Sequence, residues 1–306
     1  MKIVSLLPST TEIICALGLE EHLVGRSHEC TQSEFIQSLP AITSHEMKTD
    51  LDSKEIHYCI QKLIENGLSV YKIDAETLGS LTPDLILTQD HCEVCAASLQ
   101  DVEQAVRSHC SSQTNVLSVS PETLDDVFNS IQAIGMAADV ENRAQNLVEE
   151  LQLRLGIIQQ TINGKPRKKI VTIEWMEPLM TGGNWIPELV ELAGGQAHLA
   201  EAGKHSPVIH WERILQADPD QLLIMPCGYT IHQTREQIHL LTEKKGWKEL
   251  KAFSENEIYI LDGDRFFNRP GPGLYDSARI MAEIMHPNLF KPIYRENGWT
   301  QWDHSL

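Results

Sequence analysis

The chain has 306 residues, 42% of them hydrophobic and 22% charged, and its formal net charge at pH 7 is -18. This length favours about two domains, and the acidic balance argues against a nucleic-acid partner, because such a surface repels phosphate backbones. No segment approaches the ~20 consecutive apolar residues of a membrane helix, so no membrane insertion is expected.

The first eighteen residues, MKIVSLLPSTTEIICALG, do not resemble a secretory signal, because Pro8 and Glu12 interrupt the apolar run. The chain also has seven cysteines, and an odd number suits reduced thiols better than a disulfide framework. These features predict a cytoplasmic protein, or a periplasmic one if a leader has been removed.

Strand-length apolar runs alternate with amphipathic helical stretches in the first half. The pairs are KIVSLL (2–7) before STTEIICALG (9–18), DLILTQ (84–89) before VCAASLQDVEQAV (94–106), and NVLSVS (115–120) before PETLDDVFNSIQAIGMAA (121–138). Such alternation predicts βα units and largely parallel sheets covered by helices, an α/β fold.

The second half repeats the first. IDAETLGSLTPDLILTQDHC, from Ile73, aligns without a gap with IHWERILQADPDQLLIMPCG, from Ile209. KIVSLL near the N-terminus likewise parallels KIVTIEW (169–175). Two lobes of similar βα construction are therefore expected.

A single long helix is predicted between the lobes, from Asp139 to Ile162. Its apolar residues fall at helical spacing, and at 3.6 residues per turn it makes about six turns. The predicted organisation is an N-terminal α/β lobe (1–138), a connecting backbone helix (139–162) and a C-terminal α/β lobe (163–306).

This arrangement resembles the class III substrate-binding proteins of ABC importers, which carry cobalamin, haem or ferric siderophores. The likeness is carried by SLLPSTTEIICALGLEEHLVGRS, LTPDLIL, LMTGGNWIPELVELAGG and DRFFNRPGPGLYDSARIMAEIMHP. HEC, CEVCA, EW and MPCG are similar to a leaderless, cobalamin-binding-protein-like branch. The resemblance implies two Rossmann-like βα lobes joined by one long helix, the class III periplasmic-binding-protein fold. It further implies non-catalytic binding of a corrinoid (cobalamin-like) ligand in the cleft between the lobes, with an ABC importer permease as a partner if the protein is exported.

Fold rules place the ligand in the same region, because open parallel sheets bind ligands at the carboxyl ends of their strands. The residues expected to contact the ligand are Ser9, Thr10, His28, Glu29, Cys30, Gln89, His91, Cys92, Glu174, Trp175, Gly182, Gly183, Trp185, Cys227, Tyr229, Phe266, Phe267 and Arg269.

The cysteines leave three interpretations open. Cys92 and Cys95 form a Cys-x-x-Cys pair, which Cys30 and Cys227 could complete as a zinc or iron site. A redox pair is the second interpretation, because a helix start lowers thiol pKa values. In the third, the thiols are small, soft lining for a corrinoid pocket. His28 and His91 are candidates for an axial ligand to cobalt.

Aromatic and polar residues of the second lobe suggest one wall of the pocket. Trp175 and Trp185 flank a glycine-rich turn and could present flat faces to a macrocycle, although core packing is the alternative for each. Trp185, at a helix start, is expected to face the pocket. Glu174 could accept hydrogen bonds from ligand amides, and Tyr229 shares the loop of Cys227.

The remaining candidates follow the last predicted strand or precede the first helix. A strand-like path through Phe266 and Phe267 would point only one ring at the ligand. A lone Arg269 fits an uncharged or weakly charged ligand better than an anionic siderophore. Ser9 and Thr10 have an alternative role as the N-cap of the helix that follows them.

No enzyme motif occurs: there is no Gly-x-Ser-x-Gly elbow, phosphate loop, Gly-x-Gly-x-x-Gly or His-Glu-x-x-His. A non-catalytic corrinoid-binding protein is therefore expected. The alternative is a metal-binding protein that uses the cleft cysteines on the same fold, and a third possibility is a cytoplasmic redox or enzymatic derivative of it.

Overall fold

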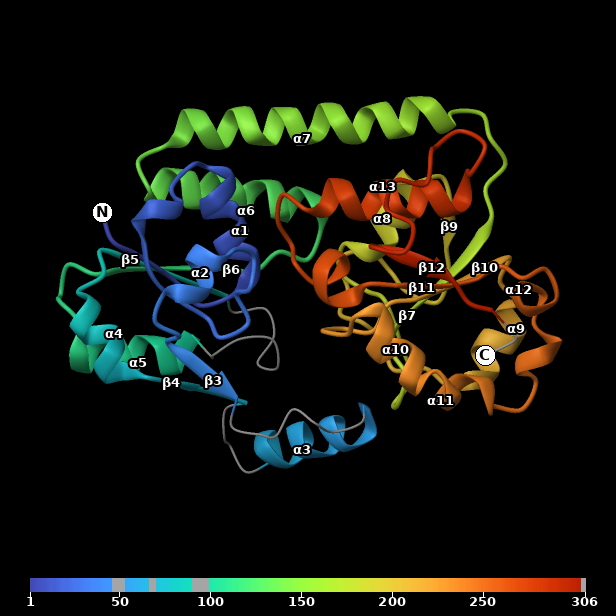
Figure 1. Ribbon diagram of the computed structural model, residues 1–306, viewed down its shortest axis with the longest axis horizontal. Helices are drawn as coiled ribbons and strands as arrows, with labels where there is room; N and C mark the ends of the chain where they lie inside the picture. Colours follow the sequence, from blue (N-terminus) through green and yellow to red (C-terminus); the bar gives the residue numbers. More distant parts are fainter. Residues whose placement is uncertain (46–52, 66–69, 90–98, 304–306) are drawn as a thin grey trace. The chain divides into compact units, whose positions relative to one another are not determined.

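The computed structural model describes residues 1–45, 53–65, 70–89 and 99–303. The chain divides into two compact units (Figure 1). Unit 1 comprises Met1–Leu51, Glu55–Pro121 and Asp125–Glu150. Unit 2 comprises Asp52–Lys54, Glu122–Leu124 and Leu151–Leu306. The long helix α7 (Glu141–Ile162) contributes residues to both units, and the predicted lobe boundaries stay a prediction.

Unit 1 is built on a parallel four-stranded sheet with the order β2-β1-β5-β6, accompanied by a small antiparallel β3-β4 pair. The strands are β1 (Ile3–Ser5), β2 (Leu23–Arg26), β3 (Thr43–His45), β4 (Tyr71–Ile73), β5 (Leu85–Gln89) and β6 (Asn115–Val119). The helical segments that precede α7 are α1 (Pro8–Ala16), η1 (Glu20–His22), α2 (Glu34–Ser38), α3 (Ser53–Glu65), α4 (Ala75–Leu81), α5 (Leu99–His109) and α6 (Leu124–Ala137).

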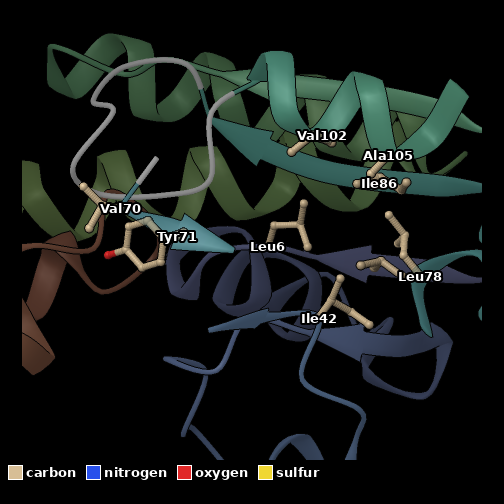
Figure 2. Packing of buried hydrophobic residues seen from close by; sticks show 9 residues of the cluster. Leu6, Ile42, Val70, Tyr71, Leu78, Ile86, Val102 and Ala105 are labelled. Carbon is tan, nitrogen blue, oxygen red and sulfur yellow. The ribbon is translucent and has the colours of Figure 1, made fainter. Parts of the chain in front are cut away.

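One face of this sheet packs on a continuous apolar cluster (Figure 2). The strand residues Val4 and Ile86 and the helix residue Leu78 are fully buried in it. Tyr71 lies at the border of the cluster, and Figure 2 shows its hydroxyl directed away from the aliphatic side chains around Leu6. A buried tyrosine typically has such an apolar body and a polar tip that needs a partner.

Unit 2 carries a second, mixed sheet with the order β12-β11-β10-β7-β8, in which β9 pairs with β7. β7, β10 and β11 are parallel, whereas β8 and β12 are antiparallel to their neighbours. Its elements are β7 (Lys169–Trp175), β8 (Met180–Thr181), α8 (Ile186–Leu192), β9 (Gln196–Ala197), α9 (Trp211–Ala217), β10 (Gln221–Ile224), α10 (Ile231–Gln237), α11 (His239–Thr242), η2 (Trp247–Glu249), α12 (Lys251–Ser254), β11 (Ile258–Leu261), η3 (Gly263–Phe267), α13 (Leu274–Met285) and β12 (Trp299–Gln301).

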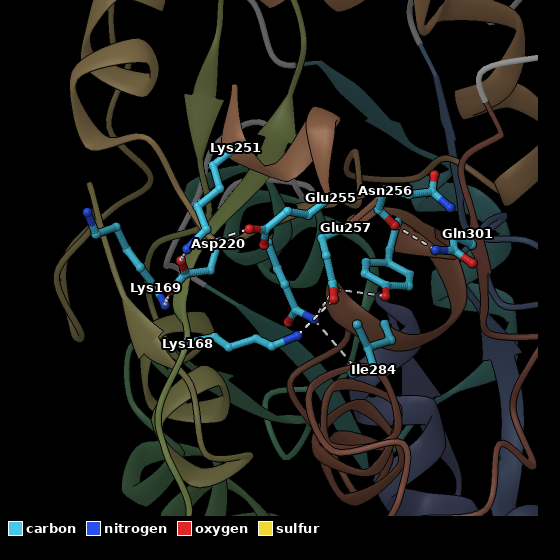
Figure 3. A network of polar contacts seen from close by, with 11 residues as sticks. Lys168, Lys169, Asp220, Lys251, Glu255, Asn256, Glu257, Ile284 and Gln301 are labelled. Atoms are coloured by element: carbon cyan, nitrogen blue, oxygen red, sulfur yellow. Dashed lines mark hydrogen bonds and ion pairs between the residues drawn. The ribbon is translucent and has the colours of Figure 1, made fainter. Parts of the chain in front are cut away.

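In both units an aspartate side chain accepts a hydrogen bond from the backbone at the start of a strand, at aligned positions. This confirms the internal repeat of the sequence. In unit 1 the Asp84 carboxylate accepts a hydrogen bond from the backbone N–H of Lys2, just before β1, at 2.7 Å. In unit 2 the aligned Asp220 accepts from the backbone N–H of Lys169, at the start of β7, at 2.7 Å. Figure 3 shows Asp220 together with Lys169 and Lys251. The Lys251 ammonium donates to the same carboxylate.

The residue two positions before each of these aspartates ends the preceding helix in the same way. Thr82 (φ 50°) closes α4 and Asp218 (φ 42°) closes α9, both in the left-handed region. The Lys2 ammonium then donates to Leu81 O, and the Lys169 ammonium to Ala217 O. Each Pro-Asp pair thus fixes where a helix ends and where the next strand joins the sheet.

The helix α7 (Glu141–Ile162) is one uninterrupted 22-residue helix (Figure 1). Val148, Leu151, Leu155 and Ile158 are buried, whereas Leu153 is 67% exposed. This stripe is the one that the helical spacing predicted, and the helix starts two residues later than expected. Among the described residues, no helix is both long and apolar enough to cross a bilayer.

Candidate functional site

The carboxyl edge of the unit 1 sheet gathers several of the predicted residues. Ser5 at the end of β1 pairs with Arg26 at the end of β2 and with Leu87 in β5. His28 and Glu29 therefore leave the sheet at this edge, directly after β2. Gln89 is the last residue of β5 and is buried.

The β3-β4 pair brings a second histidine to the same place. In its register Thr43 and His45 lie on one face, since side chains alternate along a strand, and His45 lies directly opposite Tyr71. The His28 and His45 rings meet edge to face, with centroids 4.2 Å apart. Tyr71 lies 5.3 Å from His45 and 5.6 Å from His28, again between ring centroids.

Thr43 fixes the tautomer of His28. The Thr43 hydroxyl donates to Ser27 Oγ at 3.0 Å, so its own oxygen is an acceptor toward His28. It lies 2.7 Å from His28 Nδ1 and 3.2 Å from the His28 backbone nitrogen. Nδ1 must then carry the proton and donate it, which leaves the lone pair of the neutral ring on Nε2.

One potential ligand atom from each of His28, Glu29 and His45 lies within 4.8 Å of the other two. The Tyr71 hydroxyl donates to Glu29 Oε1 at 3.2 Å, which orients the carboxylate. His28 Nε2 and His45 Nδ1 are both shielded from solvent, and neither nitrogen has a hydrogen-bond partner in the described part of the chain. We call His28, Glu29 and His45 the His-Glu-His cluster.

Burial keeps both rings of the cluster neutral. Loss of solvent, reinforced by His45 and by the Arg26 guanidinium, lowers the pKa of His28 from 6.5 to about 4. Loss of solvent also lowers the pKa of His45. Neutral imidazoles with available lone pairs are the form of histidine that binds metal ions.

Ser9 and Thr10, the predicted polar residues before the first helix, lie inside that helix. The helix α1 begins at Pro8 with Leu7 as its N-cap, so the alternative that Ser9 or Thr10 caps it is wrong. Both side chains lie inside the first turn and are buried. Thr10 Oγ1 donates to Leu7 O at 3.2 Å and lies 2.7 Å from Ser5 Oγ.

Cys30 is fully buried, and its Sγ lies 3.1 Å from Thr11 Oγ1. Burial raises the pKa of Cys30, which favours the neutral thiol over the thiolate that zinc or iron requires. These features fit a packing role. His91, Cys92 and Cys95 lie outside the described residues, so the four-cysteine site remains a prediction.

In unit 2, three loops meet at the carboxyl edge of the sheet. Beyond β10, Met225 N donates to Ile173 O at 2.8 Å and Cys227 N to Glu174 O at 3.0 Å, which continues the pairing with β7. Gly263, after β11, touches the backbone of Pro226 so closely that a Cβ would clash with the Pro226 carbonyl. Glycine is therefore required there for the third loop to join the other two.

An aromatic pair marks this edge. The Trp175 ring is half-buried and meets Tyr229 edge to face, with centroids 5.4 Å apart. The Trp175 indole N–H donates to Glu177 O at 3.0 Å, and Tyr229 Oη accepts from Gln237 Nε2 at 3.2 Å. Cys227, in the same loop as Tyr229, is exposed.

The glycines of the Gly-Gly turn serve close packing. A Cβ on Gly183 would lie 2.5 Å from Lys204 O, and one on Gly182 would lie 2.9 Å from Thr172 Oγ1. The Gly183 N–H donates to Ser206 Oγ at 3.0 Å, and the Ser206 hydroxyl donates to Glu174 Oε1 at 2.8 Å. This chain of hydrogen bonds holds Glu174 at the strand end.

The other aromatic candidates are more buried than expected. Trp185 is only 7% exposed, which matches its alternative role as a core residue. The strand-like path expected for Phe266 and Phe267 is wrong, because the segment forms the π-helical turn η3 and both rings are buried. Arg269 donates to Asp264 Oδ1 at 3.2 Å, so its charge is balanced within the unit.

His45 and Tyr71 were missed at the level of sequence, although one signal pointed to His45. The tripeptide Ser-His-Glu occurs twice, at 27–29 and 44–46, and the second copy contains His45. Neither β3 nor β4 is long enough to give a periodic pattern, since each has three residues.

Comparison with known proteins gives a family match over most of the chain. The family described as periplasmic binding protein matches residues 3–265. An uncharacterized ABC transporter substrate-binding lipoprotein, YvrC of Bacillus subtilis, is 26% identical over 95% of this chain and 81% of its own length. A vitamin B12-binding protein of Vibrio vulnificus is 21% identical over 89% of this chain and 85% of its own length.

Solved structures share the fold. The periplasmic vitamin B12 binding protein of Vibrio cholerae superposes with a TM-score of 0.66 at 19% identity, covering 93% of this chain and 96% of that one. The heme complex of IsdE from Staphylococcus aureus gives 0.70 at 15% identity, covering 93% and 98%. The likeness at these identities is one of fold, and it confirms the predicted class III architecture.

Proposed function

The chain belongs to the periplasmic binding protein family, and from this premise we propose that it is a non-catalytic binding protein whose ligand is a corrinoid. The observation that carries the proposal is the match to proteins named as vitamin B12-binding along most of their length and of this chain. An ABC importer permease is the proposed protein partner, by analogy with the substrate-binding lipoprotein relative.

The unit 2 edge supports a broad, weakly charged ligand. Trp175 and Tyr229 offer aromatic surface, and apolar faces with a few polar groups are typical of cofactor pockets. Arg269 is already paired with Asp264, so it is poorly suited to hold an anionic group. A corrin ring, whose periphery carries mostly neutral carboxamides, fits this combination.

Unit 1 supports the same proposal with polar groups. His28, Glu29 and Gln89 lie at the carboxyl edge of its sheet, where ligands of parallel sheets bind. A carboxylate accepts and a side-chain amide both donates and accepts, which matches the hydrogen bonding of carboxamides. That both edges contact one ligand stays a prediction from the sequence.

The test is a titration of freshly reduced, chelator-treated protein with aquacobalamin, followed by calorimetry and by the absorbance of the corrin. Saturable binding of one corrinoid per chain is the expected result. A change in the corrin spectrum would further report an axial ligand from the protein.

Haemin is titrated into the same batch, because a haem-bound protein shares the fold. The proposal fails if haemin saturates one site per chain while the cobalamin does not bind. It also fails if neither binds to protein whose fold is intact by circular dichroism.

A further inference from the structure

The His-Glu-His cluster contains two buried ring nitrogens that form no hydrogen bond with the described part of the chain. His28 Nε2 and His45 Nδ1 are shielded from solvent and have no hydrogen-bond partner among the described residues. More than about 90% of buried polar groups in proteins are partnered, so two orphans side by side require an explanation.

The surrounding groups prepare these atoms to bind a cation. Thr43 holds the Nδ1 proton of His28 and so leaves the Nε2 lone pair available. A hydrogen bond to the far nitrogen of a histidine is how proteins orient metal-binding rings. Tyr71 does the same for the Glu29 carboxylate.

The Arg26 guanidinium, whose charge acts on His28, does not take the place of a cation in the cluster. Its terminal nitrogens donate to backbone carbonyls, including those of Ser27 and Gln37.

We propose that His28, Glu29 and His45 bind a divalent transition-metal ion, zinc in the first place, through two imidazole nitrogens and a carboxylate oxygen. Neutral imidazoles with one carboxylate are borderline ligands that suit zinc better than calcium or magnesium. Three protein ligands leave a fourth position for water or for a small ligand.

The distances permit this site after a small closure. With metal–ligand bonds of about 2.0–2.1 Å, tetrahedral ligand atoms lie about 3.3 Å apart. The three candidate atoms lie within 4.8 Å of one another, so the side chains have to move inward by about 1 Å or somewhat more. Rotation about the χ angles of His45 and Glu29 can supply that movement.

This site differs from the one expected at the cysteines and does not rest on the proposed corrinoid. It uses no thiol, and His45 is not among the residues expected to contact the corrinoid, although His28 and Glu29 are. The two proposals are therefore tested separately, with Zn²⁺ in the absence of cobalamin and with cobalamin in the absence of Zn²⁺.

The experiment is a titration of chelator-treated full-length protein with Zn²⁺ by calorimetry, and with Co²⁺ by its visible d–d absorption. We expect one ion per chain and an intense spectrum typical of four-coordinate cobalt. His45→Gln should weaken Zn²⁺ binding more than about 100-fold, because loss of an outer partner of a metal ligand already costs about 10–100-fold.

A matched control is His232→Gln. His232 also lies near a carboxylate, with Nε2 3.5 Å from Glu236, but both side chains are largely exposed. Removing it should leave the affinity for Zn²⁺ unchanged. Thermal melts of each variant establish that the fold is intact, and Glu29→Gln, which keeps an acceptor for Tyr71, is a second ligand variant.

Two further measurements separate this site from the alternatives. Alkylation of the thiols should leave Zn²⁺ binding unchanged. In zinc-free protein His45→Gln, at a residue that is not an expected corrinoid contact, should leave the affinity for cobalamin unchanged. The proposal is overturned if the folded protein binds no Zn²⁺, if binding survives both ligand variants, or if alkylation abolishes it.

Discussion

The carboxyl edges of the two sheets are positioned in the same way, but the side chains at these edges differ in their hydrogen bonding. In unit 2 the charged side chains Glu174 and Arg269 at the edge find partners, Ser206 and Asp264, within the unit. Asn184 Oδ1 and Trp185 Nε1, beside the Gly-Gly turn, are buried atoms without a partner among the described residues. In unit 1, His28 and His45 each keep a buried nitrogen without a partner among the described residues. Side chains that are hydrogen-bonded to one another need no ligand to stay in place. A buried polar atom without a hydrogen bond raises the free energy of the folded state, and a ligand that binds it removes that cost.

This difference lies in the loops and not in the framework. Asp84 and Asp220 anchor equivalent strand starts with hydrogen bonds of equal length, 2.7 Å. The sheet of each unit thus positions its loops in the same way, and the residues within those loops decide which edge is complete. We infer that the charged side chains at the unit 2 edge are held in place before a ligand binds, and we call this the preformed edge. The unit 1 edge keeps two ring nitrogens without partners among the described residues, and we call it the unfinished edge.

The largest effect is expected from Trp175→Ala, which removes aromatic surface from the preformed edge. Loss of a central aromatic contact typically costs about 2–4 kcal/mol of binding free energy, so the affinity for cobalamin should fall about 30-fold or more. Calorimetric titration measures the change.

The control for that prediction is Trp185→Phe. Because Trp185 is only 7% exposed, its replacement by a smaller ring should leave the affinity for cobalamin within about twofold. If Trp185→Phe weakens binding as much as Trp175→Ala, the assignment of Trp175 to the binding surface is wrong.

Ser206→Ala should destabilise unit 2. It leaves the buried Gly183 N–H without its acceptor and removes a donor from Glu174, and an unsatisfied buried group costs about 1–3 kcal/mol. Urea denaturation followed by tryptophan fluorescence is suitable, since all six tryptophans lie beyond residue 150. An unchanged midpoint would contradict the view that this edge is held by its internal hydrogen bonds.

Mild acid should affect the unfinished edge first. Because burial lowers the pKa of His28 to about 4, the folded unit binds fewer protons than the unfolded chain below pH 6.5. The contribution of His28 to stability is therefore full above pH 6.5 and is lost as the pH falls toward 4. Lowered pKa values of carboxyls such as Asp220, which follow from the Lys251 hydrogen bond, act only at lower pH.

Denaturation of the metal-free protein at pH 7 and pH 5 checks this expectation. Wild type should lose more stability between the two pH values than His28→Gln, and His232→Gln should behave as wild type. Equal losses in all three proteins would show that His28 is not buried in its neutral form.

The smallest effect is expected from His45→Phe in the absence of metal. The substitution keeps a ring beside His28 and Tyr71 and removes a nitrogen that has no partner in the described chain. The free energy of unfolding should stay within about 0.5 kcal/mol of wild type or rise. A loss as large as that of Ser206→Ala would mean that the His45 nitrogen is satisfied after all, and the comparison between the edges would fail.

The framework could be predicted from the sequence because its signals are local. Helix α7 follows from apolar residues at helical spacing, and the repeat follows from two Pro-Asp pairs placed at equal distances before a strand. Such features depend on neighbours in the chain, so a pattern in one sequence is enough to find them.

The site could be predicted only in part because its contacts are made between segments. His28 was expected at the binding edge, but His45 reaches it through a three-residue strand paired with β4, and short strands carry no period. The path of Phe266 and Phe267 differs from the prediction for a different, local reason. The Asp262 side chain accepts from Arg265 N at 2.8 Å and starts a helical turn where an extended segment was expected.

The most direct test of the proposed function is a competition on one sample. Reduced, chelator-treated protein is equilibrated with equal amounts of cobalamin and haemin, separated by gel filtration, and analysed for cobalt and iron per chain. The account predicts about one corrinoid per chain and little haem. Recovery of haem alone, or of neither ligand with a folded protein, would contradict it.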